Sequence, residues 1–81
     1  MEPDLASSIR AKVAEGRLPL PADRPGKLWV GKGNGRPCDA CDQPITNTDT
    51  EYETDLPTGR TIRFHRPCFR AWHAERASRM L

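Results

Sequence analysis

Two short clusters of cysteine and histidine constrain this chain more than any other feature of its sequence. The first cluster is Cys38-Asp-Ala-Cys41, and the second, after a gap of 23 residues, is His65-Arg-Pro-Cys68. All three cysteines of the 81-residue chain lie in these clusters, together with one of its two histidines. Three thiolates and one imidazole form a complete ligand set for a four-coordinate structural zinc. We therefore predict that these four residues hold one Zn²⁺ per chain.

The size and composition of the chain indicate why it would need such a site. Hydrophobic residues make up only 36% of the sequence and charged residues 30%, with eight prolines and six glycines. A chain this short buries a thin core and usually needs a staple such as a metal ion. Three cysteines cannot all pair as disulfides, and their spacing matches metal ligation. Both observations favour a reducing compartment, so we predict a cytoplasmic location. The first residues are acidic and no long apolar run follows them, so we expect neither a signal peptide nor a membrane span, and no membrane partner.

The N-terminal part of the chain predicts one helix followed by extended structure. Leu5, Ile9 and Val13 recur every four residues, which predicts a helix from Asp4 to Glu15 that ends at Gly16. We divide the chain into residues 1–35, which pack on or lead to a metal-stapled finger, and residues 36–81, which form it. The sequence leaves open whether the helix docks on its own finger or on another chain.

The segment before the first cysteine is interpreted as apolar and then irregular. Leu28, Trp29 and Val30 form a small apolar patch, and Gly31–Arg36 forms an irregular approach to the metal site. Trp29 is interpreted as a core anchor in preference to a platform on which a nucleic-acid base stacks.

The segment between the two clusters predicts a β-hairpin. Alternation over residues 51–56 and 60–64 predicts two strands, joined by a turn at residues 57–59. Ile62 and Phe64 are predicted to point inward, and Glu51, Glu53 and Asp55 to point outward, opposite arginines. From Pro67 to about Met80 the residues favour a helix whose Phe69 and Trp72 pack on the hairpin. The predicted fold class is therefore a small α+β metal-stapled domain with a zinc knuckle, a β-hairpin, a C-terminal helix and an N-terminal helix.

The ligand pattern and its flanks resemble two known families of finger. Cys-x2-Cys, then Pro44-Ile45, a hairpin and Phe64-His65-Arg-Pro-Cys68-Phe69 resemble the first zinc half of a LIM domain. They are also similar to the poly(ADP-ribose) polymerase-type finger, which likewise ends in an aromatic residue, His-x2-Cys and Phe. The resemblance covers about residues 36–75 and implies a treble-clef-like fold, with the last two ligands carried at a helix.

The chain departs from both families. A LIM domain continues directly with a second metal site, whereas Arg70–Leu81 contains no cysteine. The polymerase-type finger has a longer gap than 23 residues between its ligand pairs. The whole pattern also resembles small bacterial zinc-finger proteins with an N-terminal helix, a resemblance that implies no activity. Cytoskeletal scaffolding and recognition of DNA breaks, the functions of the first two families, are therefore only analogies for this chain.

Residues around the four ligands carry further predictions. Arg66 and Arg70 flank Cys68 and are predicted to support the negatively charged site from outside the ligand shell. His73 lies five positions after Cys68, about 140° around a helix, and is predicted to point elsewhere. An iron–sulfur or redox site is the alternative, but the imidazole favours zinc. A closed set of four ligands argues against catalysis, so we expect neither an enzyme nor a small-molecule substrate.

Charge is strongly segregated along the chain. Residues 38–59 carry six acidic side chains and no Lys or Arg, whereas residues 60–81 carry six arginines and one acid. Such segregation is typical of a surface that binds a polyanion, and it also arises when two halves neutralise each other within a fold. Nucleic-acid binding is the first functional hypothesis, and a protein-interaction adaptor is the nearly equal alternative. The candidate nucleic-acid-binding residues are Lys32, Arg36, Arg63, Arg70, Arg76 and Arg79.

Overall fold

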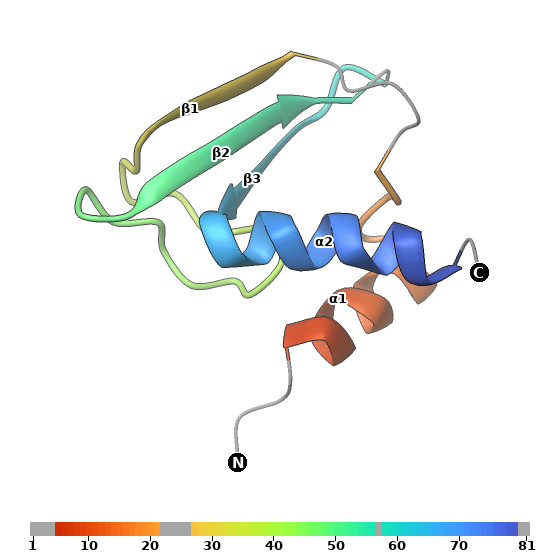
Figure 1. Ribbon diagram of the computed structural model, residues 1–81. Coiled ribbons are helices and arrows are strands. Elements are labelled where there is room, and N and C mark those ends of the chain that lie inside the picture. Colours follow the sequence, from red (N-terminus) through yellow and green to blue (C-terminus); the bar gives the residue numbers. More distant parts are fainter. Residues whose placement is uncertain (1–4, 22–26, 57, 80–81) are drawn as a thin grey trace.

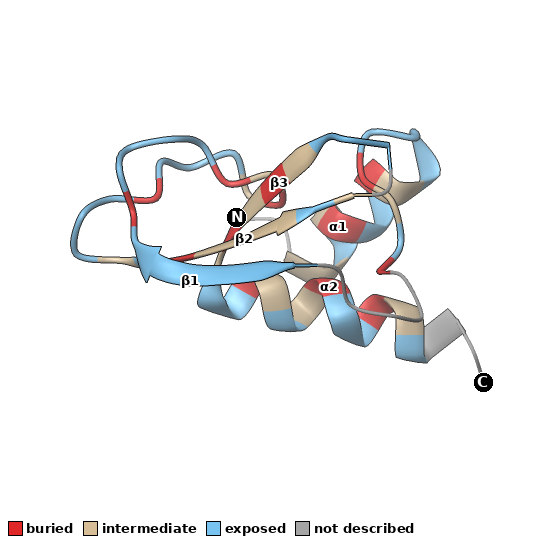
Figure 2. Cartoon of the chain, turned by 90° about the horizontal axis from the view of Figure 1, so that it is seen from above, coloured by how far each residue is buried: buried red, intermediate tan, exposed pale blue. Residues whose placement is uncertain are grey.

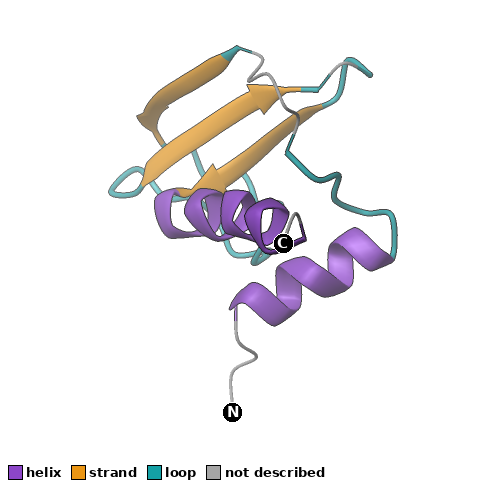
Figure 3. Ribbon diagram, turned by 45° about the vertical axis from the view of Figure 1, so that its right-hand side comes forward, coloured by secondary structure: helices purple, strands orange, loops and turns teal. Residues whose placement is uncertain are grey.

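The chain forms two helices and one antiparallel three-stranded sheet (Figure 1). This architecture comes from a computed structural model, which describes residues 5–21, 27–56 and 58–79. Figures 1 and 3 show the sheet above α2, with α1 packed on the other side of α2. The expected small α+β class is therefore confirmed. In chain order the elements are α1 (Leu5–Ala14), β1 (Leu28–Lys32), β2 (Thr50–Asp55), β3 (Thr61–His65) and α2 (Arg66–Arg79).

Helix α1 ends at the predicted glycine and docks on its own chain. Gly16 has a φ of 77°, and its N–H donates to the carbonyl of Val13 at 3.1 Å. The N–H of Arg17 donates to the carbonyl of Lys12 at 2.9 Å, which completes a Schellman cap. Ile9 is fully buried in the common core, so the apolar stripe of α1 is covered by residues of the same molecule. The predicted first residue, Asp4, lies outside the described residues.

Strands β2 and β3 form the predicted hairpin, with one correction. Ile62 and Phe64 are fully buried, as alternation predicts. Glu53 lies opposite Arg63, and their charged groups are 3.3 Å apart. Glu51 was predicted to point outward, and this is wrong, because only 8% of it is exposed. It is the cross-strand neighbour of the predicted ligand His65.

The other two predicted acid–arginine pairs do not form on this hairpin. Glu51 is paired in register with His65 instead of an arginine. Asp55 is paired with Thr61, whose hydroxyl donates to the carboxylate at 2.7 Å. Cross-strand ion pairing therefore neutralises one acid of β2, and a second ion pair between the acidic and arginine-rich segments, Arg60 with Asp39 at 3.4 Å, lies outside the paired strands.

Strand β1 is an element that the sequence did not indicate. Leu28–Lys32 pairs with β2 in antiparallel register, with Val30 opposite Tyr52. All five residues of β1 are exposed (Figure 2). The prediction that Trp29 anchors the core is wrong, since 48% of this residue is exposed. Its neighbour Val30 shares the α2 face with Tyr52, so the Trp29 side chain points to the opposite face of the sheet.

The aromatic residues of α2 join the sheet to the N-terminal segment. The rings of Phe69 and Tyr52 stack with centroids 4.9 Å apart, and those of Trp72 and Phe64 do the same at 4.9 Å. This confirms that Phe69 and Trp72 pack on the hairpin. The indole N–H of Trp72 donates to the carbonyl of Pro19 at 2.6 Å. A buried indole needs such a partner, and the bond fixes the extended segment after α1 against α2.

Candidate metal centre

The first ligand pair lies on a tight turn between β1 and β2. The N–H of Asp42 donates to the carbonyl of Cys38 at 2.9 Å, and the N–H of Cys38 donates to the carbonyl of Gln43 at 2.9 Å. Asp42 has a φ of 65°, a left-handed conformation that aspartate tolerates better than most residues. The N–H of Ala40 also donates to the sulfur of Cys38 at 3.4 Å. The turn therefore points its sulfurs inward and stabilises negative charge on one of them.

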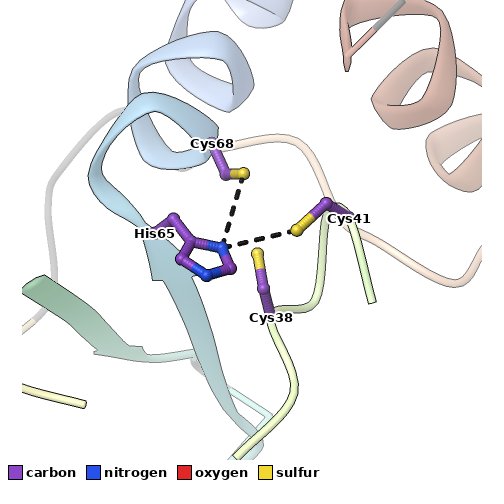
Figure 4. Close-up of side chains that lie close together, drawn as sticks. All are labelled: Cys38, Cys41, His65 and Cys68. Atoms are coloured by element: carbon purple, nitrogen blue, oxygen red, sulfur yellow. Dashed lines mark hydrogen bonds between the residues drawn. The ribbon is translucent and has the colours of Figure 1, made fainter. Parts of the chain in front are cut away.

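The second ligand pair lies at the junction of β3 and α2. His65 is the last residue of β3, and Cys68 lies in the first turn of α2. The Nδ1 atom of His65 is 3.4 Å from the sulfur of Cys41 and 3.9 Å from that of Cys68 (Figure 4). A strand that passes directly into a helix turns these two side chains toward the same point.

The four donor atoms fit the dimensions of a tetrahedral zinc site. They lie within 4.8 Å of one another, although they come from two segments separated by 23 residues. With a Zn–S bond of about 2.3 Å, the sulfurs of a regular tetrahedron would be about 3.8 Å apart. The donor chemistry fits equally well, since thiolate and imidazole suit zinc better than magnesium or calcium. The predicted ligands Cys38, Cys41, His65 and Cys68 could therefore hold a metal ion here.

The close approach of three thiols separates their pKa values. A hydrogen bond from the Cys68 thiol, helped by backbone N–H groups, lowers the pKa of Cys38 to about 4. Donation of that hydrogen bond raises the pKa of Cys68, and burial raises the pKa of Cys41. The close approach therefore favours a thiolate at Cys38 over the other two thiols. Since zinc ligands are thiolates, binding at this site would release protons and would weaken as the pH falls.

The imidazole of His65 is oriented by contacts on its far side. Its Nε2 atom is 3.2 Å from the carbonyl oxygen of Pro44 and 3.6 Å from the carboxylate of Asp49. A ligating histidine usually donates its other N–H to a carbonyl or carboxylate, which fixes the ring and its tautomer. With Nε2–H donating to Pro44, Nδ1 is left free to bind a metal. Asp49 is itself held by hydrogen bonds from Thr46, which lower its pKa.

These outer contacts were not found from the sequence. Pro44 contributes only its backbone carbonyl, which no side-chain pattern reveals. Arg66 and Arg70, which were predicted to support the site, are exposed on α2. Their role around the ligands stays a prediction.

A buried lysine joins α1 to the first ligand turn. Lys12 is 8% exposed, and its Nζ donates to the carbonyl of Asp39 at 3.0 Å and to the carboxylate of Asp42 at 2.8 Å. Both acceptors lie within the Cys38–Cys41 turn or directly after it. Lys12 is three residues after Ile9, on the apolar stripe of the helix, and this position is the signal that could have revealed it.

His73 stays out of the candidate site, as predicted. Its ring packs edge-on against Phe69 with centroids 4.5 Å apart, and against Trp72 at 5.2 Å. Burial against these rings lowers the pKa of His73. This histidine therefore has a packing role beside the aromatic core.

The candidate nucleic-acid-binding residues fall into separate groups. Lys32, Arg36 and Arg70 are exposed. Arg63 is half-buried and pairs with Glu53. Arg76 is half-buried and makes an interaction within the fold. The side chain of Arg79 lies outside the described part of the chain. The structure therefore does not bring all six residues onto one free surface.

Together, the fold and the donor set define a small α+β protein with a candidate Cys3His metal centre. No family model, curated protein or solved structure matches this chain. The resemblance to LIM and polymerase-type fingers therefore rests on the ligand pattern and its flanking residues in the sequence. Neither described helix combines the length and the apolar character that a membrane crossing requires.

Proposed function

We propose that this protein is a structural-zinc module of treble-clef-like type that binds nucleic acid. The closed Cys3His set supports a structural ion in preference to a catalytic one, because no ligand position is left for water. The ion would join the Cys38–Cys41 turn to the junction of β3 and α2 and so stabilise the surface around them. We therefore look for function on that surface and propose binding in place of catalysis.

Four exposed cations carry the proposal. Within the described residues, no carboxylate lies within ion-pair distance of these four side chains. Five other cations are each paired with an acid, namely Arg10, Lys12, Arg17, Arg60 and Arg63. Unneutralised cations are the groups that bind phosphates and release counterions. The four are Lys32, Arg36, Arg66 and Arg70; Lys27, before the start of β1 and at the opposite end of that strand from Lys32, is also exposed and unpaired among the described residues.

Two of these cations, Lys32 and Arg66, lie where elements meet at one end of the molecule. Lys32 ends β1 opposite Thr50, the first residue of β2. Thr50 and Arg66 line the same shallow hollow, of about 340 Å³. Figure 1 shows the end of β1, the start of β2 and the start of α2 close together. The first turn of α2 carries no acidic residue, so its N-terminal dipole adds to the attraction for phosphate.

The salt dependence of binding tests this proposal. We expect the zinc-loaded protein to bind a labelled 20-nucleotide strand or duplex in fluorescence anisotropy. Four phosphate contacts predict about a 100-fold loss of duplex affinity between about 50 and 200 mM salt. The double variant Arg66→Gln/Arg70→Gln should lower the slope of log K against log salt by about two.

A matched control distinguishes these residues from net charge alone. The double variant Arg17→Gln/Lys27→Gln removes the same charge away from the proposed surface and should keep most of the slope. Absence of binding at low salt, or equal losses in the two double variants, would contradict the proposal.

A protein partner is the second candidate function, and one observation favours it. Leu28, Trp29 and Val30 are exposed by 44, 48 and 56%, although all three are apolar and consecutive. A row of exposed apolar residues on an edge strand is typical of an interaction surface. An adaptor of this kind would bind a protein in the absence of nucleic acid, and the oligonucleotide experiment separates the two functions.

A further inference from the structure

Strand β1 presents an open edge of the sheet. In the strand order β1-β2-β3, β1 pairs only with β2, and no other strand of the described residues lies beside it. All five of its residues are exposed, and Lys32 at its end is its only charged residue. Edge strands usually carry proline, bulges or several charges that prevent pairing with another chain. The central residues of β1 carry none of these devices.

We propose that β1 pairs antiparallel with β1 of a second copy of this chain, which joins the two sheets into one of six strands. A two-fold interface requires a strand that is complementary to itself. Full overlap of the five residues places Val30 opposite Val30 of the second copy. It also places Trp29 opposite Gly31 of the second copy, and Leu28 opposite Lys32 of the second copy.

The side chains of β1 fit this register by size. Trp29 and Gly31 are two residues apart and share one face of the strand. A β-carbon at Gly31 would meet no other atom within 4 Å, so the space above this glycine is open. The Trp29 ring of the second copy would cover that space, a packing in which an aromatic side chain protects an edge glycine. Because a two-fold axis relates the two copies, the contact between Trp29 and Gly31 forms twice.

A buried hydrogen-bond acceptor lies next to Gly31 across the sheet. Gly31 is paired in register with Glu51 of β2. The Oε1 atom of Glu51 is buried and has no hydrogen-bond partner among the described residues. Because less than 1 Å² of this oxygen is accessible, the Trp29 ring of the second copy would cover the outer end of this row of residues without contacting the oxygen itself.

The charges of β1 also allow pairing between identical strands. Lys32 would face Leu28 of the second copy, so its aliphatic stem packs on an apolar side chain. The two Lys32 residues would be about 14 Å apart along the strands, beyond the screening length of about 8 Å at physiological salt. No like charges are directly opposite each other within the paired strands. The contact is short, so we expect weak and reversible association.

A charge-swap experiment at Val30 tests the pairing and its register. We expect the molecular mass of the zinc-loaded protein in sedimentation equilibrium to rise from 9.1 kDa toward twice that value, between about 10 µM and about 1 mM. Val30→Lys and Val30→Glu each put like charges opposite each other at the axis, so each alone should associate at least about tenfold more weakly. An equimolar mixture of the two variants should associate again.

A second variant tests the fit of Trp29 above Gly31. Gly31→Val places its β-carbon where no other atom lies within 4 Å, so its near-UV spectrum should match the wild type while its self-association is lost. A wild-type protein that stays at 9.1 kDa throughout would overturn the proposal. So would charge variants that still self-associate, a mixture that fails to associate, or association that requires added oligonucleotide.

Discussion

The two edges of the sheet have opposite environments. At the β3 edge, the N–H of Arg63 donates to the carboxylate of Asp39 at 2.7 Å, and the N–H of Asp39 donates to the carbonyl of Arg63 at 2.8 Å. The Cys38–Cys41 turn thus satisfies both backbone groups of Arg63, at the middle of that edge. At the β1 edge, Val30 is 56% exposed, and no described strand lies beside it. The sheet is therefore closed on its metal side and open on the other.

This difference follows from the source of the metal ligands. One pair lies on the turn that covers β3, and the other begins where β3 ends. A metal ion bound by both pairs would therefore fix the Cys38–Cys41 turn to strand β3. Strand β1 contributes no ligand, and α2 packs its aromatic side chains on Tyr52 and Phe64 of the other strands. The fold thus concentrates its stability at one edge and leaves the other free for contact.

Replacement of a β-branched aliphatic residue by threonine on each side of the sheet should give very different losses of stability. Ile62→Thr places a hydroxyl in the fully buried core of β3 and should lower the free energy of unfolding by about 2–4 kcal/mol. Val30→Thr, at an exposed site on β1, should change it by less than about 0.5 kcal/mol. Urea unfolding of the zinc-loaded protein, at a concentration where it is monomeric, measures both. Similar losses for the two variants would show that the edges do not differ in this way.

A smaller effect is expected at the buried lysine on the metal side. Lys12→Met removes the donor to the carbonyl of Asp39 and should cost about 1–2 kcal/mol, since that acceptor loses its partner. Lys27→Met, at an exposed position before β1, is the matched control and should cost less than about 0.5 kcal/mol. Thermal and urea unfolding of both variants provides the measurement. Equal stability of the two variants would mean that Lys12 does not fix α1 to the ligand turn.

Much of the metal side could be predicted from the sequence, because its determinants are local. Ligand spacing predicted which four side chains come together. Alternation predicted the buried faces of β3, and a four-residue period ending in Gly16 predicted α1. Each of these patterns reflects geometry within a few residues, so no knowledge of the rest of the fold was needed.

The open side could not be predicted in the same way. Strand β1 has five residues, two of them glycine or lysine, and shows no alternation of apolar and polar side chains. The exposure of Trp29 depends on where α2 lies beneath the sheet, a tertiary feature that hydrophobicity alone misjudged. Glu51 shows the converse error, because the alternation of β2 places it outward although only 8% of it is exposed. Both errors concern burial, which depends on segments far apart in the chain.

The most direct test of the account is a zinc titration of the metal-free protein. We expect the near-UV circular dichroism of the aromatic core to appear on binding and to saturate at one Zn²⁺ per chain, with native mass spectrometry giving the same ratio. A structural zinc contributes roughly 10–16 kcal/mol in small fingers, more than a domain of this size gains from its core. Cys68→Ser should abolish the native signal, whereas His73→Gln, which changes the histidine outside the site, should retain it. A native spectrum in the metal-free protein, or no stoichiometric binding, would contradict the claim that one metal ion holds this fold together.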